Sequence, residues 1–466
     1  MSKNKTLCVS EWQVFGVDDI YQVLKSCHTE RNEVSENPNK DRDISLSTKA
    51  QYDKKAQNIF KELKNFADEK GNHIFLNSYG KNRLKARNYV GLIQTKSGFC
   101  LEILPKTFRT ANENEGFEKH QDKINEAKQI LLDMLKTLKN SPFKQSHISN
   151  LKTQNAHLLE IFVIMFLNEL ETLIKKGLKS DYIEREQNRK FLKGKLLFTQ
   201  NLKHNFAHKE RFFTASDEFS SDIAPNKLIK STLLLLSTRP FSTKTNARIM
   251  QSRFVFDEIS PSQNYDKDFA KCVNLRHFKA YELILLWCKI FLKKQTFTAY
   301  QGSQNAFALL FDMNKLFESF VAWHLKKRLV NHIVKAQDGR KFLMQGDKFK
   351  IKPDLVIYDK TDTKLENPPK IIADTKWKIL SVDEAKNFSI SQSDLYQVFA
   401  YLARYQCNKG YLIYPKIDSD SIKHKRFTYK AKICFFDDYN PSGHIEHKKQ
   451  QITLKIHLFN LKKYIK

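Results

Sequence analysis

The stretch from Lys350 to Leu380, KIKPDLVIYDKTDTKLENPPKIIADTKWKIL, holds two short apolar runs separated by a polar loop with two adjacent prolines. Runs of this length, bounded by turn-forming residues, predict strands over 354–358 and 370–379. The second strand carries two charged residues, Asp374 and Lys376, where a core strand is expected to be apolar. A buried carboxylate is costly unless it is paired or binds a metal ion. That cost indicates chemistry at this strand.

Side chains alternate along a strand, so Asp374 and Lys376 are expected to project from the same face. Asp354 opens the preceding strand directly after Pro353, and antiparallel pairing of the two strands would bring it near Asp374. Two neighbouring carboxylates repel each other, which favours a cation between them. Mg²⁺ prefers carboxylate oxygens and bridges to a substrate phosphate. Lys376 would then hold or deprotonate the attacking water, or stabilise charge in the transition state.

The surrounding sequence predicts an α/β core. A helix is expected over 307–329 before the two strands, a second helix over 394–406 after them, and then a strand over 410–415. The order helix, two strands, helix, strand is typical of an α/β domain. A buried structural salt bridge among Asp354, Asp374 and Lys376 is the alternative interpretation of the same pattern.

The whole chain predicts a mixed α/β and α+β multidomain protein, because 466 residues exceed one typical core. Residues 1–150 are expected to form a mixed α/β domain that contains a hairpin around Lys96–Gly98, and residues 30–52 read as a polar loop. Residues 151–304 are predicted to be mainly helical, with a β or loop excursion near 180–222. Residues 305–466 hold the charged strand. The excursion alternates basic and aromatic residues, which suits a phosphate backbone, a protein partner or a solvated β-structure.

Composition limits the class of protein. Lys and Arg total 80 against 51 Asp and Glu, a net charge of +29. This excess favours a polyanionic partner, although a generally lysine-rich composition would give the same number. The seven cysteines are scattered without a CxxC pair, which predicts free thiols in a reducing compartment.

The sequence also argues against two other classes. The N-terminal residues have no signal-peptide pattern, and the most apolar helical run is interrupted by glutamates, so we expect a cytoplasmic protein without membrane contact. No GxxxxGK[ST] loop occurs, so the chain is not expected to bind GTP through a P-loop.

The Pro-Asp…Asp-x-Lys pattern of Asp354, Asp374 and Lys376 resembles the PD-(D/E)xK nuclease superfamily. That resemblance implies an extra metal or water ligand on the preceding helix, where Glu318 stands; an exposed helix carboxylate is the alternative. The following helix carries Gln397 and Tyr401, which are similar to a QxxxY signature whose side chains contact DNA or position the lysine. Helix packing and a surface amide are the alternative for this pair. Lys378 is a further candidate DNA contact.

Over most of its length the chain resembles the McrC family, the nuclease subunits of McrBC-type GTP-dependent restriction systems for modified cytosine. The resemblance rests on blocks in family order: YVGLIQTKSGFCLEILPK (89–106), FLKGKLLF (191–198), DEFSSDIAPNKLIKSTLLLL (217–236), DMNKLFESFV (312–321), KPDLVIYD (352–359), IIADTKWK (371–378), DLYQVFAYLARY (394–405) and GYLIYP (410–415). It implies a PD-(D/E)xK nuclease domain over 305–466, with Mg²⁺ on Asp354 and Asp374 and catalysis by Lys376. It also implies that the N-terminal part docks onto a hexameric McrB-like AAA+ GTPase, stimulates GTP hydrolysis and leaves recognition of methylated double-stranded DNA to that partner.

Two other functions fit the same residues. One is a non-catalytic GTPase activator and DNA-binding platform with a degenerate nuclease core, although an inactive site would be free to lose its costly strand charges. The other is a stand-alone repair nuclease, which would cleave DNA without a partner or GTP.

Overall fold

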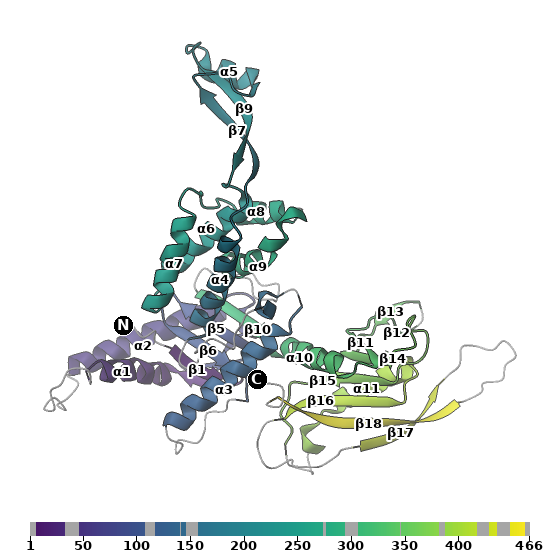
Figure 1. Cartoon of the computed structure of the whole chain (residues 1–466). Coiled ribbons are helices and arrows are strands. Elements are labelled where there is room, and N and C mark those ends of the chain that lie inside the picture. Colours follow the sequence, from purple (N-terminus) through teal and green to yellow (C-terminus); the bar gives the residue numbers. More distant parts are fainter. Residues whose placement is uncertain are drawn as a thin grey trace.

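The computed structural model describes residues 6–32, 46–107, 117–139, 141–145, 157–273, 276–293, 306–344, 346–381, 387–416, 428–435 and 448–461. Over these residues the chain is a mixed α/β multidomain protein, as the sequence predicts (Figure 1). Its parts are an N-terminal α/β region, a group of helices with a projecting β-structure, and a C-terminal sheet. Every helix in these ranges falls short of the length and apolar character that crossing a membrane requires.

The N-terminal sheet has the strand order β1-β6-β5-β10. Its strands are β1 (Thr6–Ser10), β6 (Cys100–Leu104), β5 (Tyr89–Thr95) and β10 (Ala306–Asp312). β5 and β6 form the predicted antiparallel hairpin, and Gly98, at φ 82°, adopts the left-handed conformation that its tight turn requires. β10 pairs antiparallel with β5 along its whole length. The predicted domain boundary at 305 assigns β10 to the C-terminal domain, whereas the structure places this strand in the N-terminal sheet.

The predicted helix over 307–329 is wrong in its first third. The structure divides this segment into β10 and helix α10 (Met313–Arg328). The run AFALLF at 306–311 is apolar at consecutive positions, and periodicity alone does not separate such a buried strand from a buried helix. The carboxylate of Asp312 accepts a hydrogen bond from the N–H of Asn314 at 2.9 Å, and this N-cap begins α10.

A smaller layer lies beside the N-terminal sheet. Its strands and helices are β2 (Val14–Gly16), β4 (Arg83–Ala86), β3 (Leu76–Ser78), α1 (Val17–Asn32) and α2 (Leu46–Asp68). Helix α3 (Phe117–Lys136) belongs to the other core, with α10 and the middle helices. The predicted loop over 30–52 is wrong at both ends, because α1 extends into it and α2 begins within it. Residues 33–45 lie outside the described residues, and of the side chains described in this range Lys49, Ala50 and Gln51 are exposed on α2.

The middle of the chain is helical, as predicted. Its helices are α4 (Leu158–Lys175), α6 (Ala224–Ser237), α7 (Thr243–Val255), α8 (Tyr265–Cys272) and α9 (Glu282–Leu292). Between α4 and α6 the chain leaves this group as β7 (Asp181–Arg189), β8 (Lys195–Leu196), α5 (Phe198–Asn205) and β9 (Phe212–Ser220), which project well away from the helices (Figure 1). The predicted excursion near 180–222 is therefore a small antiparallel β-structure.

The C-terminal sheet has the order β11-β14-β15-β16-β18-β17. Its strands are β11 (His332–Ala336), β14 (Leu355–Asp359), β15 (Ile371–Thr375), β16 (Lys409–Lys416), β18 (Lys448–Asn460) and β17 (Thr428–Phe435), and a separate hairpin is formed by β12 (Phe342–Met344) and β13 (Lys348–Lys350). Helix α11 (Gln392–Arg404) lies between β15 and β16 in the chain. The predicted order of helix, two strands, helix and strand is present. β11, β17 and β18 extend it beyond the prediction.

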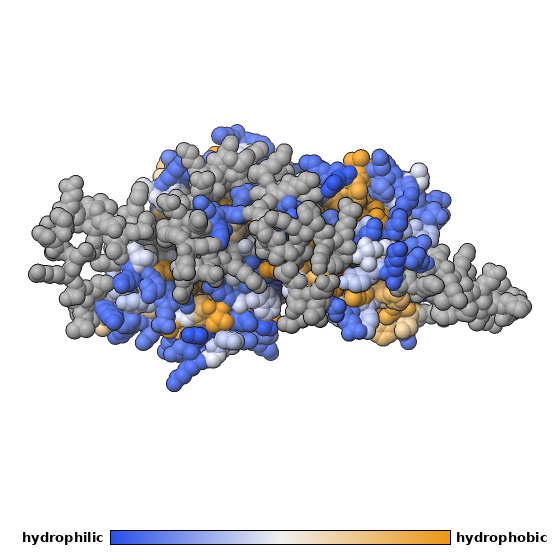
Figure 2. Space-filling view, turned by 90° about the horizontal axis from the view of Figure 1, so that it is seen from below, coloured by the Kyte–Doolittle hydropathy of each residue, from blue (hydrophilic) through white to orange (hydrophobic). Residues whose placement is uncertain are grey.

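The two faces of the C-terminal sheet pack against different partners. Leu355, Ile357 and Ala373 join the core that also contains α10, the middle helices and one face of the N-terminal sheet. Val356 and Ile372 face the other way, toward α11. A single apolar core therefore connects the N-terminal sheet to the C-terminal sheet. Seen from below, the described surface is mostly hydrophilic with separate apolar patches (Figure 2).

Candidate functional site

The charged residues of the opening stretch meet at one end of the C-terminal sheet. β14 and β15 pair antiparallel, with Leu355 opposite Ala373. Asp354 precedes Leu355 and Asp374 follows Ala373, so these two residues stand side by side at the next position of the pair. The N–H and the hydroxyl of Thr375 donate hydrogen bonds to Oδ2 of Asp354 at 2.8 and 2.7 Å. The predicted antiparallel pairing and the approach of the two carboxylates are confirmed.

Lys376 follows the last residue of β15 and is held by four contacts. Its N–H donates to the carbonyl of Ile413 on β16 at 2.9 Å, which keeps the backbone in register with the sheet. Its Nζ lies 2.8 Å from Oδ2 of Asp374 and donates to Oε1 of Gln397 at 2.8 Å. Asp394 Oδ1 stands 3.7 Å away. The ammonium group is therefore fixed between β15 and α11.

The two candidate residues of α11 form a chain of hydrogen bonds to this lysine. Gln397 accepts from Lys376 and donates through Nε2 to the hydroxyl of Tyr401 at 2.7 Å. The Tyr401 hydroxyl donates in turn to the carbonyl of Lys352 at 3.5 Å. Tyr401 is buried, whereas Gln397 is exposed. This arrangement favours a positioning role for the pair over a purely packing one.

Asp394, which the sequence analysis missed, joins Lys376 to Lys378. Its Oδ2 lies 2.6 Å from Nζ of Lys378, and its own side chain is buried at the first turn of α11. The sequence signal was a lone acid in the first turn of a predicted helix, which is ordinary for a helix N-terminus. Lys378 is half exposed and keeps its ammonium at the surface, next to the candidate site.

Glu318 projects from α10 toward the same carboxylates. Burial raises its pKa to about 7, and the negative charge of Asp354 adds to the shift. Its Oε1 accepts a hydrogen bond from Nε2 of Gln337 at 2.6 Å, while the N–H of Gln337 donates to the carbonyl of Asp354 at 2.9 Å. Gln337, a second residue missed by the sequence analysis, thus ties α10 to the start of β14. Glu318 is half buried rather than a freely exposed helix carboxylate.

The three central charges perturb one another. Burial raises the pKa of Asp374 to about 6, and the charge of Asp354 raises it further against the opposing pull of Lys376. Burial also raises the pKa of Asp354, although the hydrogen bonds from Thr375 oppose the shift. Burial alone would lower the pKa of Lys376, but Asp374 outweighs it and raises the pKa above its ordinary value. The two carboxylates of Asp354 and Asp374 therefore carry more negative charge than the one ammonium of Lys376 neutralises.

The donor set fits a hard divalent cation in part. Oδ2 of Asp374 is buried, and Nζ of Lys376 lies 2.8 Å from it. In the ranges given above, no three acidic, histidine or cysteine side chains converge closely enough to make a complete metal site. Mg²⁺ commonly takes only one or two carboxylates and completes its shell with water and substrate phosphate. Asp354 and Asp374 meet that requirement.

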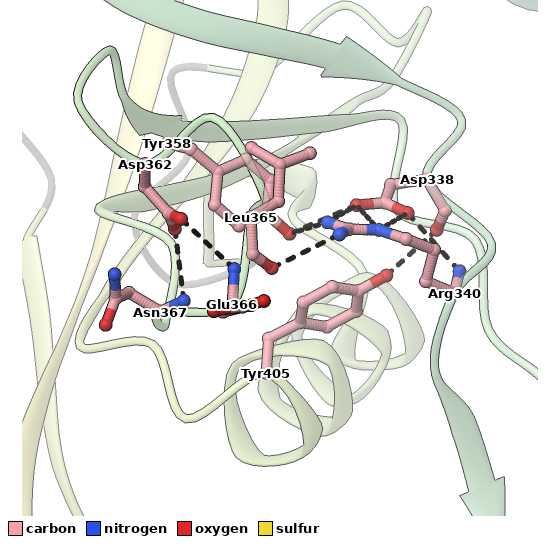
Figure 3. A network of polar contacts seen from close by, with 8 residues as sticks. All are labelled: Asp338, Arg340, Tyr358, Asp362, Leu365, Glu366, Asn367 and Tyr405. Carbon is pink, nitrogen blue, oxygen red and sulfur yellow. Dashed lines mark hydrogen bonds and ion pairs between the residues drawn. The ribbon is translucent and has the colours of Figure 1, made fainter.

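A second polar network surrounds Asp338, the residue that follows Gln337 in the chain (Figure 3). Asp338 accepts a two-pronged hydrogen bond from Arg340, and the Tyr358 hydroxyl donates to its Oδ2 at 3.1 Å. The Tyr405 hydroxyl, from the end of α11, donates to the carbonyl of Asp338 at 2.9 Å. Burial alone would raise the pKa of Asp338, but Arg340 holds it below its ordinary value. The network fixes the loop that places Gln337 between α10 and β14.

Replacing Asp338 by alanine is expected to lower the free energy of unfolding by about 2 kcal/mol, because the buried Tyr358 hydroxyl and Arg340 lose their shared acceptor. Urea denaturation followed by circular dichroism measures the loss. Asp257→Ala, at a carboxylate that is 82% exposed, is the matched control and should leave the midpoint nearly unchanged. Equal midpoints for the two variants would contradict a supporting role for this network.

The comparison with known proteins agrees with this architecture. A family model described as "McrBC 5-methylcytosine restriction system component" matches residues 84–415. The chain is similar to one in a structure of a half-complex from the tetradecameric assembly of Thermococcus gammatolerans McrB AAA+ hexamers with bound McrC. The identity is 19%, the TM-score is 0.56, and the match covers 98% of this chain and 94% of that one.

A second similar structure is the cryo-EM structure of the Thermococcus gammatolerans McrBC complex, at 20% identity and a TM-score of 0.41 over 70% of this chain and 87% of that one. No curated protein matches the chain. The likeness to the half-complex shows a shared fold over almost the whole length. The family model covers well over half of the sequence, from β4 to β16, and includes both strands of the candidate site. The chain belongs to the family of McrBC 5-methylcytosine restriction system components.

Proposed function

We propose that this protein is the Mg²⁺-dependent DNA endonuclease subunit of a two-component, GTP-driven restriction system. The observation that carries the proposal is the meeting of Asp354 and Asp374 on adjacent strands, with Nζ of Lys376 2.8 Å from Asp374. The order α10, β11, β14, β15, α11, β16 around them supports a PD-(D/E)xK core. Membership of the McrBC family supports DNA, methylated at cytosine, as the substrate.

Each side chain has a defined task in this proposal. Asp354 and Asp374 would hold Mg²⁺, with Glu318 as a further ligand or as an acceptor for a metal-bound water. The metal, when bound, polarises the scissile phosphate and lowers the pKa of a coordinated water. Lys376, oriented by Gln397, would hold the attacking water or stabilise negative charge on the phosphorus in the transition state. Tyr401 fixes Gln397, and Lys378 would bind a neighbouring phosphate.

The proposed partner is an McrB-like hexameric AAA+ GTPase. Support comes from the shared fold with a chain of an assembly that contains McrB hexamers and bound McrC. The sequence itself holds no P-loop pattern, which fits a motor on a separate chain. The N-terminal and middle regions, which one core connects to the C-terminal sheet, would dock on that partner and stimulate its GTP hydrolysis.

A plasmid-cleavage assay with Mg²⁺ tests the proposal. Cleavage is expected only in the mixture of this protein, an McrB-type GTPase and GTP, and is expected to disappear with Asp374→Ala. Cleavage by the protein alone would identify a stand-alone nuclease instead. Faster GTP hydrolysis without cleavage of methylated or unmethylated DNA would identify a non-catalytic activator.

A further inference from the structure

Trp377 connects the candidate site to a distant part of the chain. It directly follows Lys376, and its side chain is 3% exposed. Its indole Nε1 donates to both carboxylate oxygens of Glu11, at 2.9 and 3.0 Å. Glu11 follows β1 of the N-terminal sheet, 366 positions earlier in the sequence. The residue beside the candidate catalytic lysine is thus hydrogen-bonded to the end of another sheet.

Two residues next to the N-terminal sheet, Glu11 and Lys106, bind each other and Trp377. The N–H of Glu11 donates to the carbonyl of Leu104 at 3.0 Å, and Oε1 of Glu11 accepts from the N–H of Lys106 at 3.3 Å. The ammonium of Lys106 donates to the carbonyl of Trp377 at 2.5 Å and lies 5.3 Å from the centre of its ring. Side chain and backbone of Trp377 are therefore both bound by residues that follow β1 and β6.

The indole also lies next to α10. The rings of Trp377 and Phe317 lie with their centroids 5.2 Å apart, and Phe317 directly precedes Glu318. Trp377 therefore follows Lys376 in the sequence and contacts Phe317, the residue before Glu318. Glu11 is itself 3% exposed, and burial raises its pKa to about 7 against the opposing effects of Lys106 and Trp377. A buried polar network whose members are satisfied makes the segments that it joins more rigid.

We infer that Glu11, Lys106 and Trp377, here called the latch, are positioning residues through which the N-terminal sheet sets the place of Lys376. The inference rests on the proposed function, since it assigns the latch to the same reaction. An error of about 1 Å in the placement of a catalytic group costs up to about 10²-fold in rate. The backbone from β15 to Trp377 has little freedom once Lys376 is bonded to Ile413 and Trp377 to Glu11. Loosening the latch would release the second of these anchors.

The test uses Trp377→Phe, which keeps an aromatic ring against Phe317 and removes the N–H, together with Glu11→Gln and the double variant. Trp287→Phe is the matched control, because Trp287 is fully buried and its N–H finds no acceptor among the described residues. Each full-length protein is assayed with the GTPase partner, GTP, Mg²⁺ and plasmid. The latch predicts a fall in kcat of about 10- to 100-fold for each single variant, with the KM for DNA unchanged. The double variant should fall no further than the single ones.

Hydrogen exchange of residues 371–378 is measured on the same proteins. It is expected to be faster in Glu11→Gln and Trp377→Phe and unchanged in Trp287→Phe. Single variants that keep wild-type kcat, or additive losses in the double variant, would overturn the inference. If the wild-type protein does not cleave DNA, the proposed function fails. Hydrogen exchange then tests the latch independently of cleavage. Faster exchange of residues 371–378 in the two latch variants would support the coupling of the two sheets, and unchanged exchange would refute it.

Discussion

Replacing Lys376 by methionine is expected to slow DNA cleavage in the reconstituted system by about 10²- to 10³-fold, the usual cost of losing one preorganised charged group. Methionine keeps most of the aliphatic stem and removes the ammonium that Asp374, Gln397 and Asp394 hold in place. Single-turnover cleavage of a plasmid measures the loss. The KM for DNA should change little, because the group acts on the reacting phosphate.

Lys370→Met is the matched control for this variant. Lys370 directly precedes the same strand, is 56% exposed, and pairs with Asp359 away from the site. It should cleave at the wild-type rate, and Lys376→Met should stimulate GTP hydrolysis by the partner as well as the wild-type protein does. Undiminished cleavage by Lys376→Met would exclude Lys376 from the reaction and favour a structural ion pair.

Replacing Asp374 by asparagine is expected to stabilise the metal-free protein above neutral pH, by on the order of 2 kcal/mol, because it removes a buried charge whose pKa is raised to about 6. The sign follows from proton linkage. A carboxyl group with a raised pKa in the folded protein favours folding while it is protonated, and this contribution is lost as pH rises through about 6. The difference in the free energy of unfolding between the variant and the wild type should therefore shrink toward zero as the pH is lowered to about 4.

The difference between the two proteins is the informative quantity. Burial lowers the pKa of His157, His324 and His457, so these groups destabilise the folded protein as pH falls, and they do so equally in both proteins. Thermal unfolding in EDTA and in Mg²⁺ at several pH values measures both effects. Mg²⁺ should raise the Tm of the wild type increasingly as Asp374 deprotonates and should not raise that of Asp374→Asn. The free energy of unfolding of the wild type should increase by about 1.4 kcal/mol for each tenfold excess of Mg²⁺ over its Kd. An identical Mg²⁺ response in both proteins would rule out Asp374 as a ligand.

Local sequence patterns were sufficient for the centre of the site. The alternation of Asp374 and Lys376, with Asp354 after a proline, predicted two strands and a shared face, and the structure brings these side chains together. Strand periodicity and a pair of residues four apart on a helix depend only on neighbours in the chain. Such features can be predicted without knowing the tertiary fold.

The remaining features depend on contacts between distant segments. The neighbouring sequence does not distinguish Gln337 or Asp394 from ordinary polar residues, because each acquires its role only when α10 or α11 packs beside β14 and β15. The Glu11–Trp377 hydrogen bond joins residues that are 366 positions apart in the sequence. The sequence predicts helix at β10 because its apolar run has no period, and only the pairing of this segment with β5 shows that it is a strand.

The junction of β10 with α10 limits how this protein can be divided or recombined. The strand completes one sheet, and the helix that begins directly after it carries Glu318 to the other. A C-terminal fragment that began before β10 would expose this apolar strand without its partner β5, and such a strand promotes aggregation. If the fragment began after β10, it would lack this strand, and cutting the chain before β10 would leave β5 as an open edge in the N-terminal fragment. Relatives that exchanged C-terminal segments at this point would have a broken sheet. Recombination between family members is therefore expected to keep β10, α10 and both sheets together.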